Sequence, residues 1–289
     1  MTADTGAVLS PPVFDDIIRA ADRIRGTVIR TPLEHSALLS ATAGVPVYLK
    51  LECWQRTRSF KLRGATNAIR ALDSGTLQRG LVTASAGNHG QAVALAATQT
   101  GARATVFVPT DTPAVKKARI RAFGAELDDS SASYDDAEIA AVAHARTTHK
   151  YFVHAFSDPH VVAGQGTVGL EIIEDLPDVK HVIVPVGGGG LSTGIGIALA
   201  ALAPDARLVG VQSTETRAMY DAFAAGRIVD SPITPTIAEG LAGCTDATAY
   251  AWLRSLTDRI VLVDEAALAP AIRTLFDAAG IVAEGSGIT

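Results

Sequence analysis

The stretch "HVIVPVGGGGLSTGIGIALAALAPDARLVGVQ", residues 181–212, decides the fold of this chain. Residues 181–190 predict a buried strand that ends in a loop, residues 191–203 predict an alanine-rich helix, and residues 206–212 predict another strand. Continuous apolar strands that alternate with helices form parallel sheets whose two faces are covered. The stretch therefore predicts an α/β protein.

The same alternation of strand and helix extends over the rest of the sequence. The helix over residues 112–124 is expected to end at Gly124, and residues 14–24 carry apolar side chains at helical spacing. We expect two open, twisted, mostly parallel sheet domains covered by helices. The large domain takes residues 1–54 and 156–289, and the small domain takes residues 55–155. The strands of the small domain are expected near residues 81–84, 104–108 and 125–127.

Composition and charge exclude several classes of protein. The 289 residues include 48% hydrophobic and 19% charged residues, which is typical of a globular protein with a sizeable core. The formal net charge of −5, without a long run of one sign, argues against nucleic-acid binding and against attraction to an anionic membrane. No apolar stretch is long enough to span a bilayer, and residues 1–16 lack the features of a signal peptide. Cys53 and Cys244 alone cannot form a disulfide framework, so we expect a reducing cytoplasm.

Four consecutive glycines, Gly187–Gly190, lie between the strand and the helix of the opening stretch. Without β-carbons, the backbone can bring several N–H groups close to one anion, and the N-terminus of the following helix adds favourable partial charge. The segment lacks both the Gly-Lys-Ser/Thr ending of a P-loop and the spaced glycines of a dinucleotide-binding motif. It predicts a phosphate cradle, with a tightly packed strand–helix turn as the alternative.

In "TASAGNHGQAVALAA", residues 83–97, a turn of small residues is expected to connect a second strand to a helix. The backbone N–H groups of Ser85, Gly87 and Asn88 would face outward at the helix start, where they suit a carboxylate. The Asn88 amide could also donate to a phenolate-like oxygen. The alternative is a helix cap, because Ser and Asn are preferred capping residues, and His89 by itself predicts a structural histidine.

The stretch "SFKLRGATNAI", residues 59–69, sets Lys61 near the start of a helix that Ser59 is expected to cap. A charged lysine at that place opposes the helix dipole. A neutral amine or an imine suits it better, because burial and nearby positive potential lower the pKa of a lysine. The alternative is an ordinary exposed lysine.

A reactive lysine, a phosphate cradle and an anion-binding turn with an amide donor together match the requirements of pyridoxal 5′-phosphate. The aldehyde requires an amine such as Lys61, the phosphate requires Gly187–Gly190, and the ring oxygen requires a donor such as Asn88. The substrate carboxylate then takes the helix start near residues 85–89. The three motifs therefore predict a pyridoxal-phosphate enzyme.

Seven segments carry a resemblance to a known family, and they run through nearly the whole chain. The sequence resembles the fold-type II pyridoxal-phosphate enzymes, with a tryptophan synthase β-like fold, and among them the threonine/serine dehydratases and their serine racemase relatives. The order and spacing of the segments make this resemblance highly specific. They are "RTPLEHSALLS", "VYLKLECWQRTRSFKLRGATNAI", "VTASAGNHGQAVALAA", "GQGTVGLEI", "PVGGGGLSTG", "IAEGLA" and "VAEGSG".

The resemblance implies a role for each residue at a matching position. Lys61, in the small domain, forms the Schiff base with the cofactor, while Phe60 packs beside the ring and Asn88 bonds its hydroxyl group. Two acidic residues lie near the site, Glu284 on the cofactor side and Glu239 on the substrate side. The large domain is the cofactor-binding domain, and its phosphate ligands are the N–H groups of Gly187, Gly188, Gly189, Gly190 and Leu191. The loop that receives the substrate carboxylate consists of Ser85, Ala86, Gly87, Asn88 and His89.

Four departures from the family pattern bear on function. Racemases carry a serine where this chain has Ala86, and a methyl group cannot exchange a proton, so efficient racemisation is not expected. Arg58 replaces the glycine that usually precedes Ser-Phe-Lys, so we expect the loop backbone or the pocket entrance to differ there. Cation-binding relatives place Glu and Asp where this chain has Gln212 and Ala218, so we expect no metal ion. The Ser-Gly-Gly-Asn turn that contacts the pyridine nitrogen in the family does not occur in this sequence, so the partner of that nitrogen stays open.

The resemblance implies β-elimination of water from a small β-hydroxy amino acid, such as L-threonine or L-serine, to give a 2-oxo acid and ammonia. Lys61 is the expected catalytic residue, which removes the Cα proton after the substrate amine has displaced it. The alternatives are an amino-acid racemase, a β-replacement synthase and, more remotely, a pyridoxal-phosphate-binding regulatory protein without turnover. We expect a small amino-acid substrate, no nucleic-acid or membrane partner, and a homodimer or homotetramer.

Overall fold

The structure is a computed structural model that describes residues 9–232, 234–243 and 245–289, so Cys244 lies outside the described residues. By packing, the chain divides into two compact units. Unit 1 contains residues 9–28 and Arg56–Gly164, and unit 2 contains Ile29–Gln55 and Gln165–Thr289.

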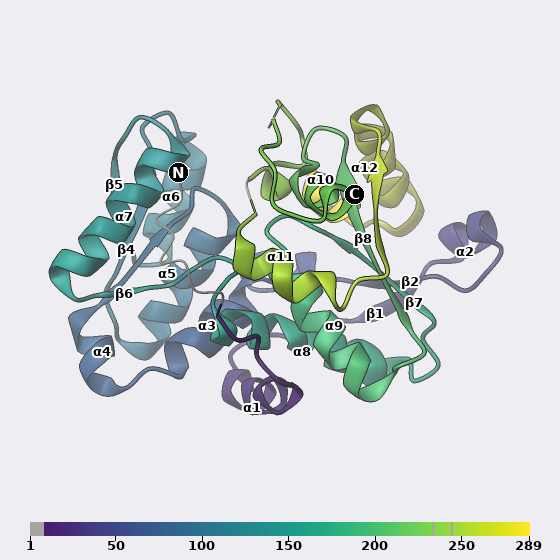
Figure 1. Ribbon diagram of the computed structural model, residues 1–289, viewed down its shortest axis with the longest axis horizontal. Coiled ribbons are helices and arrows are strands. Elements are labelled where there is room, and N and C mark those ends of the chain that lie inside the picture. Colours follow the sequence, from purple (N-terminus) through teal and green to yellow (C-terminus); the bar gives the residue numbers. More distant parts are fainter. Residues whose placement is uncertain (1–8, 233, 244) are drawn as a thin grey trace. The chain divides into compact units, whose positions relative to one another are not determined.

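Unit 1 is built around a parallel sheet with the strand order β5-β4-β3-β6 (Figure 1). Successive residues of a strand face opposite sides of a sheet. On one side, Val82 and Phe107 lie in a cluster with alanines of α7. On the other, Leu81 and Val106 lie in a cluster with side chains of α3, α5 and α6. The elements are α1 (Phe14–Ile24), α3 (Lys61–Arg70), α4 (Ser74–Arg79), β3 (Leu81–Ala84), α5 (Asn88–Thr100), β4 (Ala104–Pro109), α6 (Ala114–Ala122), β5 (Glu126–Ser131), α7 (Tyr134–Thr148), β6 (Tyr151–Phe152) and the first residues of α8 (Pro159–Asp175).

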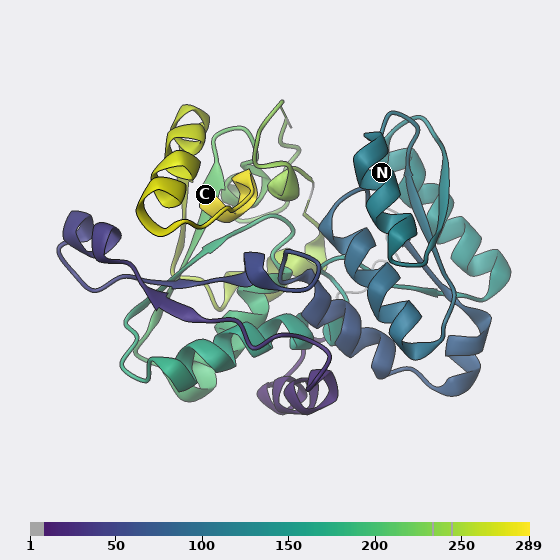
Figure 2. The same ribbon diagram turned by 180° about the vertical axis from the view of Figure 1, so that it is seen from behind.

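Unit 2 contains a parallel sheet with the order β7-β8-β9 and an antiparallel pair, β1-β2, whose strands are connected by α2 (Figure 2). The parallel sheets of both units confirm the predicted α/β class. The elements besides the rest of α8 are β1 (Leu33–His35), α2 (Ala37–Ala43), β2 (Tyr48–Lys50), the 3₁₀ helix η1 (Glu52–Trp54), β7 (His181–Pro185), α9 (Gly190–Leu202), β8 (Arg207–Ser213), α10 (Ala218–Ala225), the 3₁₀ helix η2 (Glu239–Leu241), α11 (Ala247–Arg254), β9 (Arg259–Val263), α12 (Glu265–Ala279) and α13 (Gly285–Ile288).

The division into units differs from the sequence-based domain boundaries at three places, one of which is the single residue Gln55, which belongs to unit 2 and not to the small domain. Residues 9–28 and 156–164 belong to unit 1, whereas the sequence placed them with the large domain. The reason is local packing, since α1 contacts α3 and a β-carbon on Gly164 would lie 2.6 Å from the carbonyl oxygen of Arg63. The boundary after Gly164 falls inside the continuous helix α8, where the composition of the sequence does not change.

The helix that follows the four glycines is fixed by close packing in unit 2. A β-carbon on Gly169 of α8 would lie 3.0 Å from the Ala198 Cβ and 3.0 Å from the Ile195 Cα of α9. Glycine at this place lets the backbones of α8 and α9 approach each other. α9 also contacts β7 and β8, so its N-terminus has a set position beside the end of β7.

The first strand of the unit 2 sheet is less covered than its sequence predicts. Val182 and Val184 are buried, whereas Ile183 between them is 68% exposed. Successive side chains of a strand face opposite sides, so Val182 and Val184 lie on the covered face of β7 and Ile183 lies on the other face, which the described residues leave exposed. None of the described helices combines the length and the apolar character that crossing a membrane requires.

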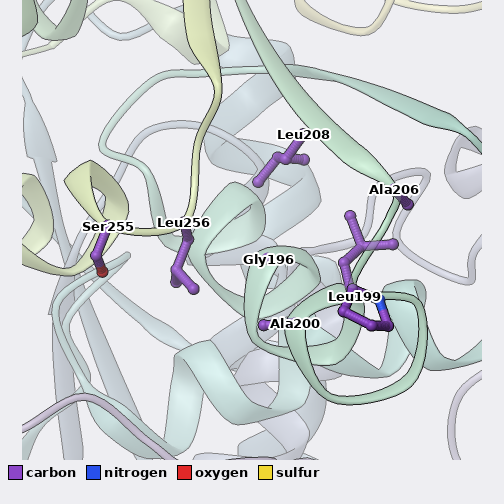
Figure 3. A pocket seen from close by; sticks show the side chains of 8 residues that line it. Gly196, Leu199, Ala200, Ala206, Leu208, Ser255 and Leu256 are labelled. Atoms are coloured by element: carbon purple, nitrogen blue, oxygen red, sulfur yellow. The ribbon is translucent and has the colours of Figure 1, made fainter.

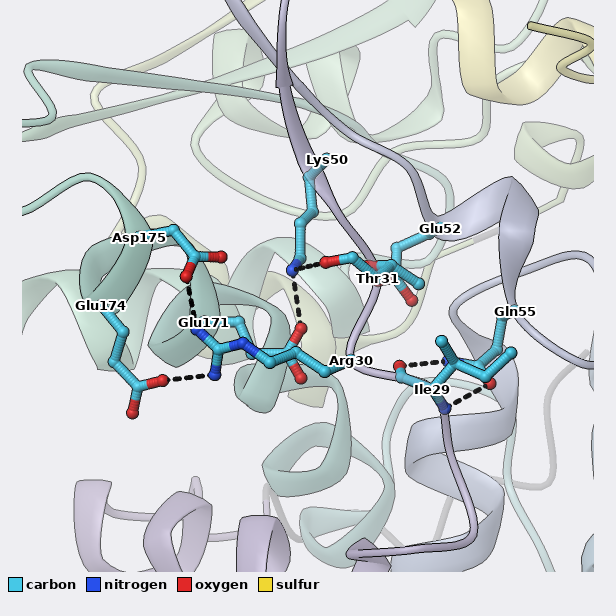
Figure 4. Close-up of polar contacts among 9 residues, drawn as sticks. All are labelled: Ile29, Arg30, Thr31, Lys50, Glu52, Gln55, Glu171, Glu174 and Asp175. Carbon is cyan, nitrogen blue, oxygen red and sulfur yellow. Dashed lines mark hydrogen bonds and ion pairs between the residues drawn. The ribbon is translucent and has the colours of Figure 1, made fainter.

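Ion pairs fix the β1-β2 region to the C-terminal half of α8 (Figure 4). The Lys50 Nζ lies 2.6 Å from the Glu171 carboxylate, and the two side chains are only 7% and 12% exposed. Arg30 donates to the carboxylates of Glu174 and Asp175 on the same helix, at 2.5 Å each. The ion pair of Lys50 is therefore a structural contact. Removing one partner from a buried pair of this kind costs about 3–5 kcal/mol of stability.

Candidate functional site

The loop between β7 and α9 carries the four glycines of the predicted phosphate cradle. β7 ends at Pro185 and α9 begins at Gly190, with Gly189 as the N-cap at a φ of 90°. This left-handed backbone favours glycine over residues with a side chain. A β-carbon on Gly189 would also lie 3.1 Å from the Met219 Cε. The backbone conformation therefore favours glycine here, and a β-carbon would also press on the end of the Met219 side chain.

Gly187, at the other end of this loop, faces the turn η2. A β-carbon on Gly187 would lie 3.2 Å from the carbonyl oxygen of Gly240, whose N–H donates to the Ser286 Oγ at 2.7 Å. The two predicted acidic residues belong to the same neighbourhood, because Glu239 begins η2 and Glu284 is the N-cap of α13. Unit 2 thus brings the glycine loop together with the segments that carry Glu239 and Glu284.

The start of α9 offers polar groups that suit an anion. Among the described residues, no side chain caps this helix, so its first backbone N–H groups keep their capacity to bind a ligand. The Ser192 and Thr193 hydroxyls are buried and lack a hydrogen-bond partner in the described part of the chain. Leaving a buried polar group without a partner costs about 1–3 kcal/mol. This polarity at a helix N-terminus fits the phosphate of the predicted cofactor.

Lys61 is the first residue of α3, and it is half-buried. Its Nζ donates to the carbonyl oxygen of Ala155 at 3.0 Å and lies 5.4 Å from the centroid of the Phe60 ring. The predicted cap by Ser59 is wrong, because Phe60 is the N-cap with helical angles of −59° and −21°, and no described side chain caps α3. The chain therefore enters α3 already in helical conformation, and the Ser59 hydroxyl is buried without a partner in the described residues.

The predicted carboxylate-binding turn connects β3 to α5. β3 ends at Ala84 and α5 begins at Asn88, with Gly87 as the N-cap. Within the described chain no side chain caps α5, so the alternative of a serine or asparagine cap does not hold. The Ser85 Oγ instead accepts the Gly87 N–H at 3.2 Å, and Ala86 packs against the hydrophobic core of unit 1. The Ser85 N–H donates to the carbonyl oxygen of Phe107 at 3.1 Å, so the prediction that the N–H groups of both Ser85 and Gly87 face outward is wrong. The anion-binding role of the first residues of α5 stays a prediction.

His89, the second residue of α5, has a structural side chain. It is 3% exposed, and its Nε2 lies 3.0 Å from the carbonyl oxygen of Val153. Because a carbonyl only accepts, Nε2 carries the proton, and the buried Nδ1 has no partner in the described residues. Burial, followed by the positive charges of Lys61 and His154, lowers the pKa of His89 to about 3. His89 is therefore neutral at physiological pH, and its Nε2–H is engaged by the carbonyl of Val153.

Arg58 has a backbone conformation that glycine adopts more readily than arginine. Its φ is 63°, in the left-handed region that L-residues rarely occupy. The expectation that the loop backbone or the pocket entrance differs here from the family pattern stays a prediction. An exposed arginine in this conformation costs about 1–2 kcal/mol.

Gln212 has both ends of its amide bonded to the backbone of unit 2. Its Nε2 donates to the carbonyl oxygen of Val186 at 2.9 Å, and its Oε1 accepts the Tyr220 N–H at 2.8 Å. Ala218 is buried at the start of α10. Across the described residues, no group of three or more His, Cys, Asp or Glu side chains is arranged to hold a metal ion.

The predicted site residues form two groups, one in each unit. Unit 1 holds Lys61 and the start of α5, whose proximity is evident from the effect of the Lys61 charge on the pKa of His89. Unit 2 holds the glycine loop with Glu239 and Glu284. Sequence reasoning missed Ala155, because a backbone carbonyl leaves no signal in the sequence. The hydroxyls that follow the glycines, on Ser192 and Thr193, could have been recognised from their place at a helix start.

A small pocket of about 130 Å³ in unit 2 lies away from these groups, beside the C-terminal part of α9 (Figure 3). It carries no acid, base or thiol, so it offers no chemistry of its own. Its lining consists of Gly196, Leu199, Ala200, Pro204, Ala206, Leu208, Ser255 and Leu256.

Known proteins resemble this chain in both sequence and structure. Residues 24–289 match the protein family described as "Pyridoxal-phosphate dependent enzyme". The chain is 42% identical over 276 residues to a protein from Thermotoga maritima named L-threonine ammonia-lyase, covering 95% of this chain and 69% of that protein. It is 41% identical over 272 residues to a protein of the same name from Geobacter sulfurreducens, covering 94% and 68%. The structure of maize serine racemase is similar, with a TM-score of 0.93 and 34% identity, covering 96% of this chain and 85% of that one.

Proposed function

The chain belongs to the family of pyridoxal-phosphate dependent enzymes, and from this premise we propose that it eliminates water from a small β-hydroxy amino acid to give a 2-oxo acid and ammonia. L-Threonine and L-serine are the proposed substrates, in agreement with the names of the relatives. One observation carries the proposal. At the start of α9, directly after the four glycines, the described residues provide no side-chain cap, and the buried hydroxyls of Ser192 and Thr193 have no hydrogen-bond partner there, as a phosphate site requires.

The residues of the three sequence motifs would hold the cofactor. Lys61 would bind the aldehyde carbon through Nζ, Asn88 would donate to the ring hydroxyl, and the N–H groups of residues 187–191 would bind the phosphate. Phe60 would pack beside the ring. When bound, pyridoxal 5′-phosphate supplies an electron sink for the negative charge that develops at the substrate Cα.

Lys61 would be the base that removes the proton from the substrate Cα. With the cofactor bound, the neutral Nζ would accept this proton. The hydrogen bond to the Ala155 carbonyl oxygen orients Nζ before the transfer. His89 does not compete for the proton, because its pKa of about 3 keeps it neutral and weakly basic.

The start of α5 would bind the substrate carboxylate. The uncapped N–H groups after Gly87 provide donors, and the positive end of the helix dipole favours an anion. Fixing the carboxylate there and the amine at the cofactor holds the Cα–H bond in one orientation relative to Lys61, which is the main contribution that positioning makes to the rate.

The proposal is tested with Lys61→Ala and a panel of β-hydroxy amino acids. Wild-type protein is expected to release 2-oxo acid and ammonia from at least one of them, and Lys61→Ala is expected to lose both this turnover and the yellow absorbance of the lysine-bound cofactor. Lys180→Ala, which changes an exposed lysine of unit 2, is the control and retains both. Turnover by Lys61→Ala would contradict the assignment of the base.

An amino-acid racemase is the second candidate, because maize serine racemase is a close structural relative. Racemisation needs a second group that exchanges a proton, and Ala86 places a methyl group in the turn before α5. Chiral analysis of serine after long incubation is expected to show little D-serine with the wild type. Ala86→Ser, which introduces a hydroxyl, is expected to raise the D-serine yield.

Two further alternatives are separated by their products. A β-replacement synthase would incorporate an added thiol or amine, and a regulatory protein would show the cofactor spectrum without releasing ammonia from any hydroxy amino acid. We also propose a homodimer or homotetramer in the cytoplasm. Light scattering measures that assembly directly, and a monomeric mass would contradict it.

A further inference from the structure

Gln212 connects the segment before the glycine loop of unit 2 to helix α10, which packs beside the end of that loop. This residue of β8 is 1% exposed, and its amide is bonded at both ends. Nε2 donates to the carbonyl oxygen of Val186 at 2.9 Å, and Oε1 accepts the N–H of Tyr220 in α10 at 2.8 Å. One neutral side chain therefore joins two backbone segments that no strand pairing connects directly.

The two segments flank the glycine loop. Val186 directly precedes Gly187, the residue that faces η2. Tyr220 follows Met219, whose Cε would lie 3.1 Å from a β-carbon on Gly189. The Gln212 amide thus sets the distance between the beginning of the loop and the helix against which its end is packed.

We propose that Gln212 is a positioning residue that holds the Gly187–Gly190 loop in the conformation that binds the cofactor phosphate. The inference rests on the proposed function, and it extends it to a residue that does not touch the cofactor. The amide supplies a donor for Val186 and an acceptor for Tyr220 together without a charge at every pH. A carboxylate of the same shape offers acceptors alone, so it would leave the Val186 carbonyl unpaired and place a charge in a buried site.

The test compares pyridoxal 5′-phosphate with pyridoxal, which lacks the phosphate. Cofactor-free wild-type protein and Gln212→Glu are titrated with each compound, and the absorbance of the lysine-bound aldehyde reports binding without any turnover. Gln212→Glu is expected to bind pyridoxal 5′-phosphate roughly tenfold more weakly and pyridoxal with unchanged affinity. The ratio of the two affinities is therefore expected to fall about tenfold.

A change of pH separates positioning from a general loss of structure. At acidic pH the introduced carboxyl group is protonated and can again donate to the Val186 carbonyl, so the affinity ratio of Gln212→Glu is expected to return toward that of the wild type at the same pH. Gln212→Leu removes both hydrogen bonds without adding a charge. It provides the test if Gln212→Glu does not fold, and its affinity ratio is expected to stay low at every pH.

Gln55 offers a matched control in the same unit. It is also 1% exposed, and its amide bonds both the N–H and the carbonyl of Ile29 at 2.9 Å. Gln55→Glu is expected to lower the unfolding temperature as Gln212→Glu does, without changing the affinity ratio. The inference is overturned if Gln212→Glu keeps the wild-type ratio, if its ratio stays low at acidic pH, or if Gln55→Glu lowers the ratio equally. A wild type that binds no pyridoxal 5′-phosphate would instead refute the proposed function itself.

Discussion

Gly187 and Gly240 approach each other so closely that a β-carbon on Gly187 would lie 3.2 Å from the carbonyl oxygen of Gly240. The opposing atom belongs to the backbone, which cannot move aside as the end of a flexible side chain can. The contact therefore couples the glycine loop to η2, the turn that begins with Glu239. Any side chain at position 187 must displace one of these two segments.

Gly187→Ala is expected to weaken the binding of pyridoxal 5′-phosphate roughly tenfold, because overpacking of this kind costs about 1–3 kcal/mol. Titration of the cofactor-free protein measures the effect. Gly243→Ala is the control, since a β-carbon there meets no atom within 4 Å. Equal affinities for the two variants would show that the loop tolerates a methyl group and does not form the cradle.

Gly87→Ala separates substrate binding from folding. A β-carbon on Gly87 meets no atom within 4 Å, so the fold has room for the methyl group of alanine. Stability is expected to stay unchanged or to rise by about 0.4–1 kcal/mol. The methyl group would nevertheless occupy the proposed carboxylate position, so KM for the hydroxy amino acid is expected to rise while cofactor affinity is unchanged. An unaltered KM would place the substrate carboxylate elsewhere.

The sequence predicted the strands and helices around the three motifs because each motif combines an apolar strand with small residues at a helix start. It could not predict that Ser59 leaves α3 uncapped, since the backbone angles of Phe60 decide this. The Ala155 carbonyl and the Gln212 amide were missed as site contacts for another reason. Ala155 lies 94 positions from its partner Lys61 and acts through its backbone, and Gln212 lies 26 positions from its partner Val186. The boundary inside α8 was missed because a continuous helix has no linker composition.

Arg58→Gly is expected to stabilise unit 1. An arginine at a φ of 63° lowers the stability of the folded chain by about 1–2 kcal/mol. Replacing it with glycine removes this strain, but the greater flexibility of the unfolded chain offsets about 0.5–1 kcal/mol of the gain. The net gain is therefore expected to be about 0.5–1 kcal/mol, measured by urea unfolding. Arg103→Gly, at an exposed position of unit 1 without a positive φ, is expected to lose stability. A loss of similar size in Arg58→Gly would mean that the Arg58 side chain makes compensating contacts.

His89 is expected to make the fold sensitive to acid. Burial is the main cause that lowers its pKa from 6.5 to about 3 in the folded chain, so between these values the unfolded chain binds a proton that the folded chain does not. Stability is therefore lost as the pH falls from about 6.5 toward 3, by up to about 1.4 kcal/mol per pH unit.

The variant His89→Asn removes this proton and is expected to flatten the dependence of the unfolding free energy on pH in that window, although the lost bond to Val153 lowers stability at pH 8. His149→Asn serves as the control. His149 is exposed and has a left-handed backbone, a conformation that asparagine tolerates. A slope that is the same in His89→Asn and in the wild type would show that His89 does not titrate as inferred.

The central claim is that Lys61 binds the cofactor aldehyde, and reduction with borohydride tests it most directly. The cofactor-loaded protein is reduced, digested and analysed by mass spectrometry, so that the attached cofactor marks one lysine permanently. We expect the added mass on the peptide that contains Lys61 and on no other peptide. A mark on a different lysine, such as the ion-paired Lys50, or no mark on any peptide of a protein that had been yellow before reduction, would contradict the account.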